Sequence, residues 1–174
     1  VNPNIKKLVE NVRFHPSLVA DEMKFQHMWA DKFYTLNAAD YGSPSSRPRQ
    51  YMADFVRLDA LGPVLSLSPN MLLAPHRHCK YQHMPCIVTG MQTHRIPQVY
   101  DSDLRAASRL TSSECEVMQG WPPGITNGTH SNLRASYATR LQHVGNSLNN
   151  SQLYYILRSF TPASTCAQNY PAPA

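Results

Sequence analysis

The alternation of apolar and polar positions in the first sixty residues predicts strands around one helix. The run 5–12 leans apolar and ends at the polar pair Glu10-Asn11, as a short buried strand does. Residues 33–36 and 51–58 are rich in aromatic and branched side chains, which indicates two further strands. Apolar residues recur at roughly helical spacing over 17–29, where Ser17 is of an N-cap type.

Residues 59–108 show no sustained period. Prolines interrupt them throughout, at Pro63, Pro69, Pro75, Pro85 and Pro97. Because proline cannot donate to a strand ladder or continue a helix, the region is predicted to be a loop-rich insert. Short strands are expected around 71–73 and 87–88.

The last third of the chain is predicted to be helical. Thr111 and Glu114 match the capping-box pattern, so a short helix should begin there and end at Gly120. Apolar residues recur at helical spacing over 133–144 and again over 153–160. The turn Gly145-Asn146-Ser147 separates these two helices, and the proline-containing tail from residue 161 is expected to be mobile.

Composition narrows the class of protein. The chain has 174 residues, 42% of them hydrophobic and 16% charged, which suits a globular domain with a core and excludes a highly charged disordered chain. A net charge of +5 is compatible with a polyanionic partner. The 4 cysteines are expected to be reduced, and no apolar run approaches membrane-spanning length. The chain does not begin with Met, which is compatible with a piece of a longer protein.

Three features carry candidate chemistry. Glu10 stands at the carboxyl end of a predicted strand, where open α/β sheets place their ligands. Arg47 and Arg49 lie two apart before another strand, so in extended chain their guanidinium groups would share a face. The turn Gly145-Asn146-Ser147 combines a glycine with two short hydrogen-bonding side chains. Taken singly, each of these features could also have a purely structural role, as a helix cap or a solvated turn.

The order of these features resembles the second half of a cytosine-5 DNA methyltransferase. Glu10-Asn11-Val12 is similar to the family's Glu-Asn-Val motif, and residues 42–49 are similar to its Gly-x-Pro-Gln-x-Arg-Pro-Arg phrase, with Ser45 in place of Gln. Residues 110–122 resemble its Leu-Thr-x-x-Glu segment, with Trp121 in place of Phe, and the Gly-Asn-Ser turn follows. The animal de novo and plant domains-rearranged enzymes are the most similar types.

The resemblance implies an α/β fold: the C-terminal portion of a Rossmann-like methyltransferase sheet with a small, loop-rich target-recognition insert. Residues 1–58 and 109–160 would belong to the catalytic domain, 59–108 would be the recognition region facing the major groove, and 161–174 a mobile tail. The mostly parallel sheet would receive some three strands from this chain.

The resemblance also implies transfer of a methyl group from S-adenosylmethionine to carbon 5 of a flipped cytosine. Glu10 would hold the ring nitrogen N3 and the amino group, Arg49 would contact the ring oxygen, and Arg47 would order the pocket or the nucleophile loop. Asn146 and Ser147 would lie near S-adenosylmethionine. Arg77 and Lys80 are predicted DNA contacts, no metal is expected, and the protein would act in the nucleus.

The family's first half has no counterpart here. There is no Phe-x-Gly-x-Gly cofactor loop and no Pro-Cys motif ahead of Glu10. Pro85-Cys86 falls inside the recognition region, so motif order argues against Cys86 as the nucleophile. The chain alone is therefore expected to be inactive, and a second chain or segment would supply the cofactor loop and the thiol.

Two alternatives stay open. One is a non-catalytic regulatory or DNA-binding subunit of a methyltransferase complex. The other is a zinc-stabilised nucleic-acid-binding module, because potential zinc ligands crowd one segment: His76, His78, Cys79, His83 and Cys86.

Overall fold

The computed structural model of the protein describes residues 8–11, 17, 21, 24, 34–53, 62, 64–87, 96–128 and 135–158. The fold is mixed α/β, and the chain divides into two compact units. The first, here called the sheet unit, comprises Val1–Leu36, Pro48–Gly62 and Leu153–Ala174. The second, the hairpin unit, comprises Asn37–Arg47 and Pro63–Gln152.

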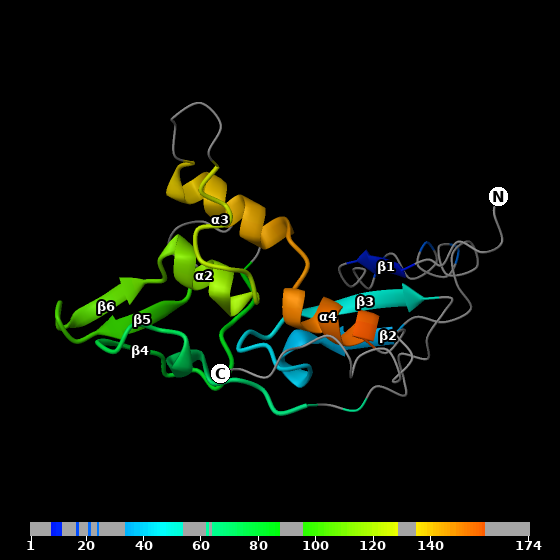
Figure 1. Cartoon of the computed structure of the whole chain (residues 1–174), viewed down its shortest axis with the longest axis horizontal. Coiled ribbons are helices and arrows are strands. Elements are labelled where there is room, and N and C mark those ends of the chain that lie inside the picture. Colours follow the sequence, from blue (N-terminus) through cyan, green and yellow to red (C-terminus); the bar gives the residue numbers. More distant parts are fainter. Residues whose placement is uncertain are drawn as a thin grey trace, which may run out of the picture. The chain divides into compact units, whose positions relative to one another are not determined.

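The sheet unit is built on three strands. They are β1 (Leu8–Asn11), β2 (Tyr34–Asn37) and β3 (Pro48–Ala53), in the order β1-β3-β2 (Figure 1). The central strand is the best buried, since Tyr51 and Met52 are each 1% exposed. Successive strand residues point to opposite faces, so both faces of β3 are covered.

These strands confirm the predicted elements and correct their arrangement. The strand predicted over 51–58 begins earlier, at Pro48. The expectation of a mostly parallel sheet is wrong, because β1 pairs with β3 antiparallel. A parallel neighbour needs a crossover of about a dozen residues or more, and only 38–47 join β2 to β3. The helix predicted over 17–29 lies almost wholly outside the described residues.

The hairpin unit combines a small sheet with helices. Its strands are β4 (Arg77–His78), β5 (Gln98–Asp101) and β6 (Ala106–Arg109), paired antiparallel in that order. Its helices are α2 (Ser112–Met118) and α3 (Tyr137–Asn146). A further helix, α4 (Asn150–Arg158), begins in this unit and continues into residues of the sheet unit. No helix of the described residues is long and apolar enough to cross a membrane.

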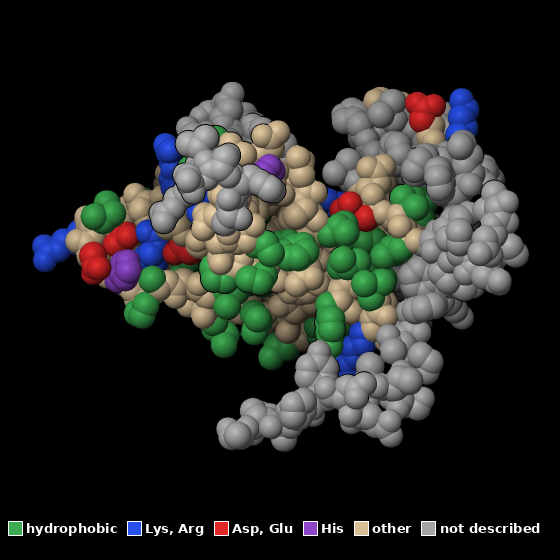
Figure 2. Space-filling view, turned by 45° about the horizontal axis from the view of Figure 1, so that its top comes forward, with side chains coloured by type: hydrophobic (Ala, Val, Ile, Leu, Met, Phe, Trp, Pro, Cys, Tyr) green, Lys and Arg blue, Asp and Glu red, His purple; other side chains and the backbone are tan. Residues whose placement is uncertain are grey.

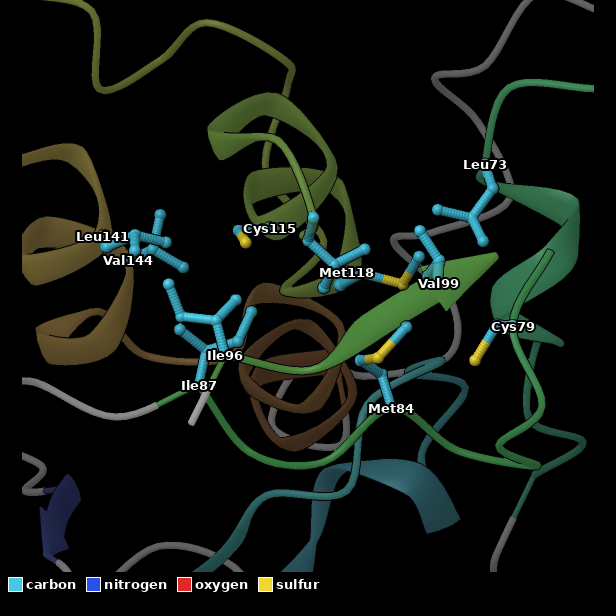
Figure 3. Close-up of a cluster of buried hydrophobic side chains, with 11 residues drawn as sticks. Leu73, Cys79, Met84, Ile87, Ile96, Val99, Cys115, Met118, Leu141 and Val144 are labelled. Carbon is cyan, nitrogen blue, oxygen red and sulfur yellow. The ribbon is translucent and has the colours of Figure 1, made fainter. Parts of the chain in front are cut away.

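One hydrophobic core joins the small sheet to the helices of this unit. Figure 3 shows Val99 of β5 beside Met118 of α2, and Leu141 and Val144 of α3 facing Ile87 and Ile96. The buried members of the core are Leu73, Cys79, Met84, Ile87, Ile96, Val99, Leu110, Cys115, Met118, Leu141 and Val144. The boundary expected between residues 108 and 109 therefore does not divide the packing: side chains from both of its sides fill the same interior.

The elements of the predicted loop-rich insert differ from expectation. The segment around 71–73, predicted as a strand, holds a short 3-10 helix, Pro69–Met71, and Ile87 lies outside any strand. The hairpin of β5 and β6 was not predicted. Its alternation is hidden because Asp101 occupies an inward position, and a charged residue there breaks the expected apolar period.

The capping box at the start of α2 is confirmed. Thr111 Oγ1 accepts a hydrogen bond from Glu114 N at 3.1 Å, and Glu114 Oε2 accepts one from Thr111 N at 2.7 Å. Both bonds satisfy backbone donors that the first turn of a helix leaves without partners.

We expect Thr111→Ala to lower the free energy of unfolding by about 1 kcal/mol, since it removes the N-cap acceptor. Thr111→Ser keeps the hydroxyl and should stay within about 0.5 kcal/mol of the parent. Urea denaturation followed by circular dichroism measures both. Equal losses for the two variants would contradict a role for the hydroxyl.

Gly120 terminates α2 as predicted. Its φ of +77° lies in the left-handed region, and a Cβ added there would fall 2.8 Å from Ser151 Oγ and 3.0 Å from Ser151 N. The turn therefore needs glycine both for its backbone angle and for close approach. The break between α3 and α4 is also confirmed, although Gly145 and Asn146 form the last turn of α3 and Ser147 is its C-cap.

Candidate functional site

Glu10 and Arg49 form an ion pair on neighbouring strands of the sheet unit. Arg49 Nε lies 3.0 Å from Glu10 Oε1, and the two side chains are 9% and 22% exposed respectively. The register of β1 and β3 explains the contact: Glu10 lies opposite Tyr51, so Arg49 is its diagonal neighbour on the same face. Residues from two separate sequence motifs thus meet at one place.

The pair presents hydrogen-bonding groups of opposite kind side by side. A carboxylate accepts and a guanidinium only donates, so together they complement a planar group that carries both a donor and an acceptor along one edge. Arg49 NH1 also donates to the carbonyl of Pro48 at 2.8 Å, which fixes the plane of the guanidinium. Glu10 retains enough exposure to meet a ligand from solvent.

Arg47 has a different role from Arg49. It belongs to the hairpin unit and is 3% exposed. Its NH1 donates to Ile87 O at 3.0 Å and approaches Cys86 Sγ at 3.5 Å. Its NH2 donates to Gly145 O at 3.0 Å and to Ser147 O at 2.7 Å. Arg47 therefore ties the backbone after Cys86 to the turn that ends α3.

Arg47 and Arg49 were expected to share one face, and the structure gives them different partners. Arg49 belongs to β3 and pairs with Glu10, whereas Arg47 precedes β3 and binds backbone carbonyls. Arg47 is a positioning residue for the Gly-Asn-Ser turn. Its bonds to the carbonyls of Gly145 and Ser147 agree in kind with the expected ordering role.

Hydrogen bonds that the sequence did not indicate hold the predicted cofactor turn, Gly145-Asn146-Ser147, in place. Ser147 Oγ donates to Val144 O at 2.8 Å. Trp121 Nε1 donates to Ser147 Oγ at 3.2 Å and to Leu148 O at 3.1 Å. The indole N–H is a donor that Phe lacks, so the Trp in the Gln-Gly-Trp-Pro segment gives the turn an extra anchor. Asn146 is exposed at the end of the helix.

Glu116 fixes the loop that carries this tryptophan. It is fully buried and accepts hydrogen bonds from Gly124 N, from the backbone and hydroxyl of Thr126, and from Arg140 NH2 at 2.8 Å. Burial alone would raise the pKa of Glu116, but the hydrogen bonds from Thr126, Arg140 and Gly124 outweigh it and lower the pKa. The carboxylate therefore stays charged and holds the loop after α2 in place.

Arg77 is not a DNA contact, contrary to the prediction. Only 8% of it is exposed. Its Nε and NH2 donate to Glu114 at 2.7 and 3.0 Å, and its NH1 donates to Asp101 at 2.9 Å and to Ser108 Oγ at 2.8 Å. A further bond from NH2 reaches Arg109 O at 2.7 Å. The five donors are thus used inside the protein. Burial alone would lower the pKa of Arg77, but Glu114 and Asp101 raise it.

The predicted zinc ligands do not converge. All of them lie in the described part of the chain, where the group of His, Cys, Asp and Glu donor atoms within 4.8 Å of one another is His76, Asp101 and Asp103. Figure 2 shows histidine and acidic side chains close together at the hairpin end, on the left. Asp101 is already engaged, with Oδ2 on Arg77 and Oδ1 on the backbone of Asp103 and Leu104. The zinc-module alternative loses its geometric basis.

Three cysteines are free thiols, as expected: Cys79, Cys86 and Cys115; Cys166 lies outside the described residues. Burial raises the pKa of Cys115 to about 12, and the charges of Glu114 and Glu116 add to the effect. Burial also raises the pKa of Cys79. Because the thiolate is the nucleophile, neither buried thiol suits covalent chemistry.

We expect iodoacetamide at pH 8 to modify Cys86, which is partly exposed, well before Cys79 or Cys115. For Cys115, a pKa shift from 9.0 to about 12 lowers the thiolate fraction on the order of 1,000-fold. Peptide mass spectrometry over a time course measures the three rates. Urea should abolish the difference, and native labelling of Cys115 as fast as Cys86 would contradict its burial.

Comparisons with known proteins give a fold and no closer assignment. No family model matches the chain, and no curated protein matches it. Among solved structures it is similar to a methyltransferase of Entamoeba histolytica, EhMeth, with a TM-score of 0.62 and 15% sequence identity. The match covers 89% of this chain and 62% of that one. The fold of this chain is thus similar to part of the fold of that protein. This chain thus spans less than two thirds of the protein that it resembles.

Proposed function

We propose that this chain is part of a DNA (cytosine-5)-methyltransferase and supplies the groups that hold the target cytosine. The observation that carries the proposal is the ion pair of Glu10 and Arg49, with 3.0 Å between Nε and Oε1. Each residue belongs to a separate motif that resembles the family, and they meet on adjacent strands. The structural similarity to a methyltransferase supports the same reading.

The pair suits the edge of a flipped cytosine. That edge presents the ring oxygen, ring nitrogen N3 and the exocyclic amino group in a row. Arg49 would donate to the ring oxygen, while the Glu10 carboxyl group would share a proton with N3 and accept from the amino group. Arg49 also orients Glu10, so the two act as one preorganised unit.

Glu10 would contribute most after a thiolate has added to carbon 6 of the ring. Addition moves electron density toward carbon 5 and N3, and a proton held between Glu10 and N3 stabilises that charge. Carbon 5 then takes up the methyl group, and loss of its proton with departure of the thiolate restores the ring. Bound S-adenosylmethionine would supply the methyl group as an electrophile, with S-adenosylhomocysteine as the leaving group.

The turn at the end of α3 would meet that cofactor. Asn146 is exposed there, and Ser147 lies at a position fixed by Arg47 and Trp121. A hydroxyl offers one donor and two acceptors. The hydroxyl of Ser147 donates to Val144 and accepts from Trp121, so it retains one acceptor position. The turn thus fits a polar ligand, with Asn146 making the larger contribution.

The proposal requires partners. A second chain or segment would bring the nucleophilic cysteine and the cofactor loop that complete the Rossmann-like sheet, and DNA would be the substrate. The net charge of +5 is complementary to a polyanion. The site of action would be the nucleus.

The direct test uses protein that contains both segments, in one chain or two. We expect incubation with S-adenosylmethionine and cytosine-containing DNA to produce 5-methylcytosine, detected by mass spectrometry of the digested nucleosides. Methyl groups found only on adenine or on protein would overturn the proposal. So would the absence of 5-methylcytosine from an assembled complex that binds both substrates.

A second candidate is a non-catalytic DNA-binding subunit of such a complex. The lack of a Pro-Cys motif ahead of Glu10 in this sequence is compatible with it. Co-purification of partner proteins distinguishes the two candidate functions. A partner that brings Pro-Cys and Phe-x-Gly-x-Gly, and whose activity depends on Glu10, supports the shared active site; a partner active without Glu10 supports the subunit.

A further inference from the structure

The small sheet of the hairpin unit has two unlike faces. Val99 and Asp101 of β5 are buried, whereas Gln98 and Tyr100 are exposed. The inward face packs on the core. The strand register aligns the outward residues in rows, with His78 opposite Tyr100 and Tyr100 opposite Ala107. Aromatic and hydrogen-bonding side chains therefore gather on the face turned away from the core.

A hollow lies at this sheet. It is a cavity of about 440 Å³ whose lining combines outward polar and aromatic residues with apolar ones: His78, Lys80, Tyr81, Pro85, Ile96, Pro97, Gln98, Val99, Tyr100 and Ala107. This volume lies within the range of small-molecule sites, roughly 300–1,000 Å³. Ala107 also lines the hollow, and its small side chain beside the large Tyr100 leaves room over β6.

The hollow combines aromatic rings with cationic groups. Lys80 Nζ lies 5.6 Å from the centre of the Tyr81 ring, and Lys80 itself is exposed. Tyr100 is 50% exposed, so much of its side chain is open to a ligand. A second row across the sheet brings exposed Arg109 opposite Gln98 on the same face. The surface thus offers rings for stacking beside groups that can contact phosphate.

We propose that this hollow binds one unpaired nucleotide of a nucleic-acid strand. The base would stack on Tyr100 or Tyr81, Gln98 would hydrogen-bond its edge, and Lys80 and His78 would contact the neighbouring phosphates. The inference rests on the proposed function, in which Glu10 and Arg49 already form one nucleic-acid site. The hollow would be a second such site. The predicted DNA contact at Lys80 belongs to this site.

An unpaired nucleotide suits the hollow better than a duplex does. Bases in a duplex are stacked on one another, so their faces are covered and only their edges and phosphates are accessible. Stacking on a tyrosine requires a base whose face is open. Binding of phosphates alone would need clustered cations and would gain nothing from the exposed ring of Tyr100. The substrate is therefore expected to carry an unpaired stretch in addition to the target cytosine.

The test measures strand binding by fluorescence anisotropy with the complete protein. The labelled probes are a single-stranded DNA, the same sequence as RNA, and the corresponding DNA duplex. Tyr100→Ala removes a stacking ring, and Ala107→Leu fills the hollow without removing any contact. Tyr154→Ala is the matched control, since this tyrosine is 59% exposed on α4 and does not line the hollow.

We expect Tyr100→Ala and Ala107→Leu each to weaken single-strand binding about 5- to 100-fold, the loss of one stacked base, with duplex binding nearly unchanged. Tyr154→Ala should bind as the parent does, and Tyr100→Phe should keep most of the affinity. A DNA strand or an RNA strand that binds more tightly identifies the source of the nucleotide. Thermal unfolding by circular dichroism verifies that every variant remains folded.

The proposal is overturned if the Tyr100→Ala and Tyr154→Ala proteins bind the strand equally, or if all losses are equal for strand and duplex. Its failure is distinguishable from failure of the proposed function. Methyl transfer that depends on Glu10 but ignores Tyr100 would remove only this site. If strand binding depends on Tyr100 but the protein complex never forms 5-methylcytosine, the nucleotide site is supported and the proposed function fails.

Discussion

Replacing Glu10 with Gln in the completed enzyme is expected to slow methyl transfer by about 100-fold or more. The amide keeps the shape of the side chain, but it cannot carry the charge or share the proton that the ring nitrogen needs once the nucleophile has added. DNA binding should persist, because most of that affinity comes from phosphate contacts. Single-turnover rates of 5-methylcytosine formation measure the effect on chemistry separately from product release.

Controls separate this role from loss of the ion pair. Arg49→Lys keeps a positive charge next to Glu10, so it should preserve the fold while losing the planar donor set. Asp40→Asn neutralises an exposed carboxylate elsewhere and should leave the rate unchanged. A Glu10→Gln enzyme that turns over at the parental rate would remove Glu10 from the reaction.

Arg77→Met is expected to lower the free energy of unfolding by about 3–5 kcal/mol, the largest loss of stability that we anticipate from a single substitution. Methionine keeps an unbranched apolar stem, but it leaves the carboxylates of Asp101 and Glu114 buried without the cation that lies 2.9 and 2.7 Å from them. The exposed Arg158→Met serves as the matched control and should cost no more than about 0.5 kcal/mol. Urea titrations measure both.

The pH dependence of stability supplies an independent readout. Burial alone would raise the pKa of Asp101, but the hydrogen bonds from Leu104 N, Arg77 and Asp103 N lower it below its ordinary value of 3.8. A lowered folded-state pKa gives stability that is complete above 3.8 and lost as the pH falls through the folded-state value. In Arg77→Met the unpaired carboxylates favour protonation, so this loss in acid should shrink or reverse. A variant with the parental acid profile, or with the small loss of Arg158→Met, would contradict the buried network.

Combining Arg77→Met with Asp101→Asn and Glu114→Gln should recover part of the lost stability. The three side chains are in direct contact, so their effects are not additive. Removing all the charges removes the cost of burying them unpaired. Strict additivity would show that the three residues do not act as a network.

The sequence predicted elements that depend on neighbours along the chain. The capping box of α2 joins Thr111 and Glu114, three residues apart, and its hydrogen bonds form whatever the rest of the protein does. The left-handed glycine at the end of that helix is likewise a local requirement. The strands near 8–11, 34–37 and 48–53 were found because branched and aromatic residues gather there. The turn between α3 and α4 was found because Gly145, Asn146 and Ser147 lie between two segments of helical period.

Motif order carried one long-range prediction, the meeting of Glu10 with an arginine. The resemblance also gave Arg47 and Arg49 different roles, but it did not identify the partners of Arg47, which lie 98 and 100 residues further along the chain at Gly145 and Ser147. The start of β3 at Pro48 gives the two arginines different surroundings.

Only the tertiary structure decided which charged side chains are buried. Arg77 looks like a surface cation, yet carboxylates 24 and 37 residues away draw it into the interior. That burial places Asp101 inward and so hides the strand pattern of the hairpin, whose outward face carries Tyr100. Hydrogen bonds within one turn of helix are fixed by residue spacing, so the sequence by itself determines them. A buried ion pair depends on which distant strands pair and in what register, and that is settled only when the chain packs.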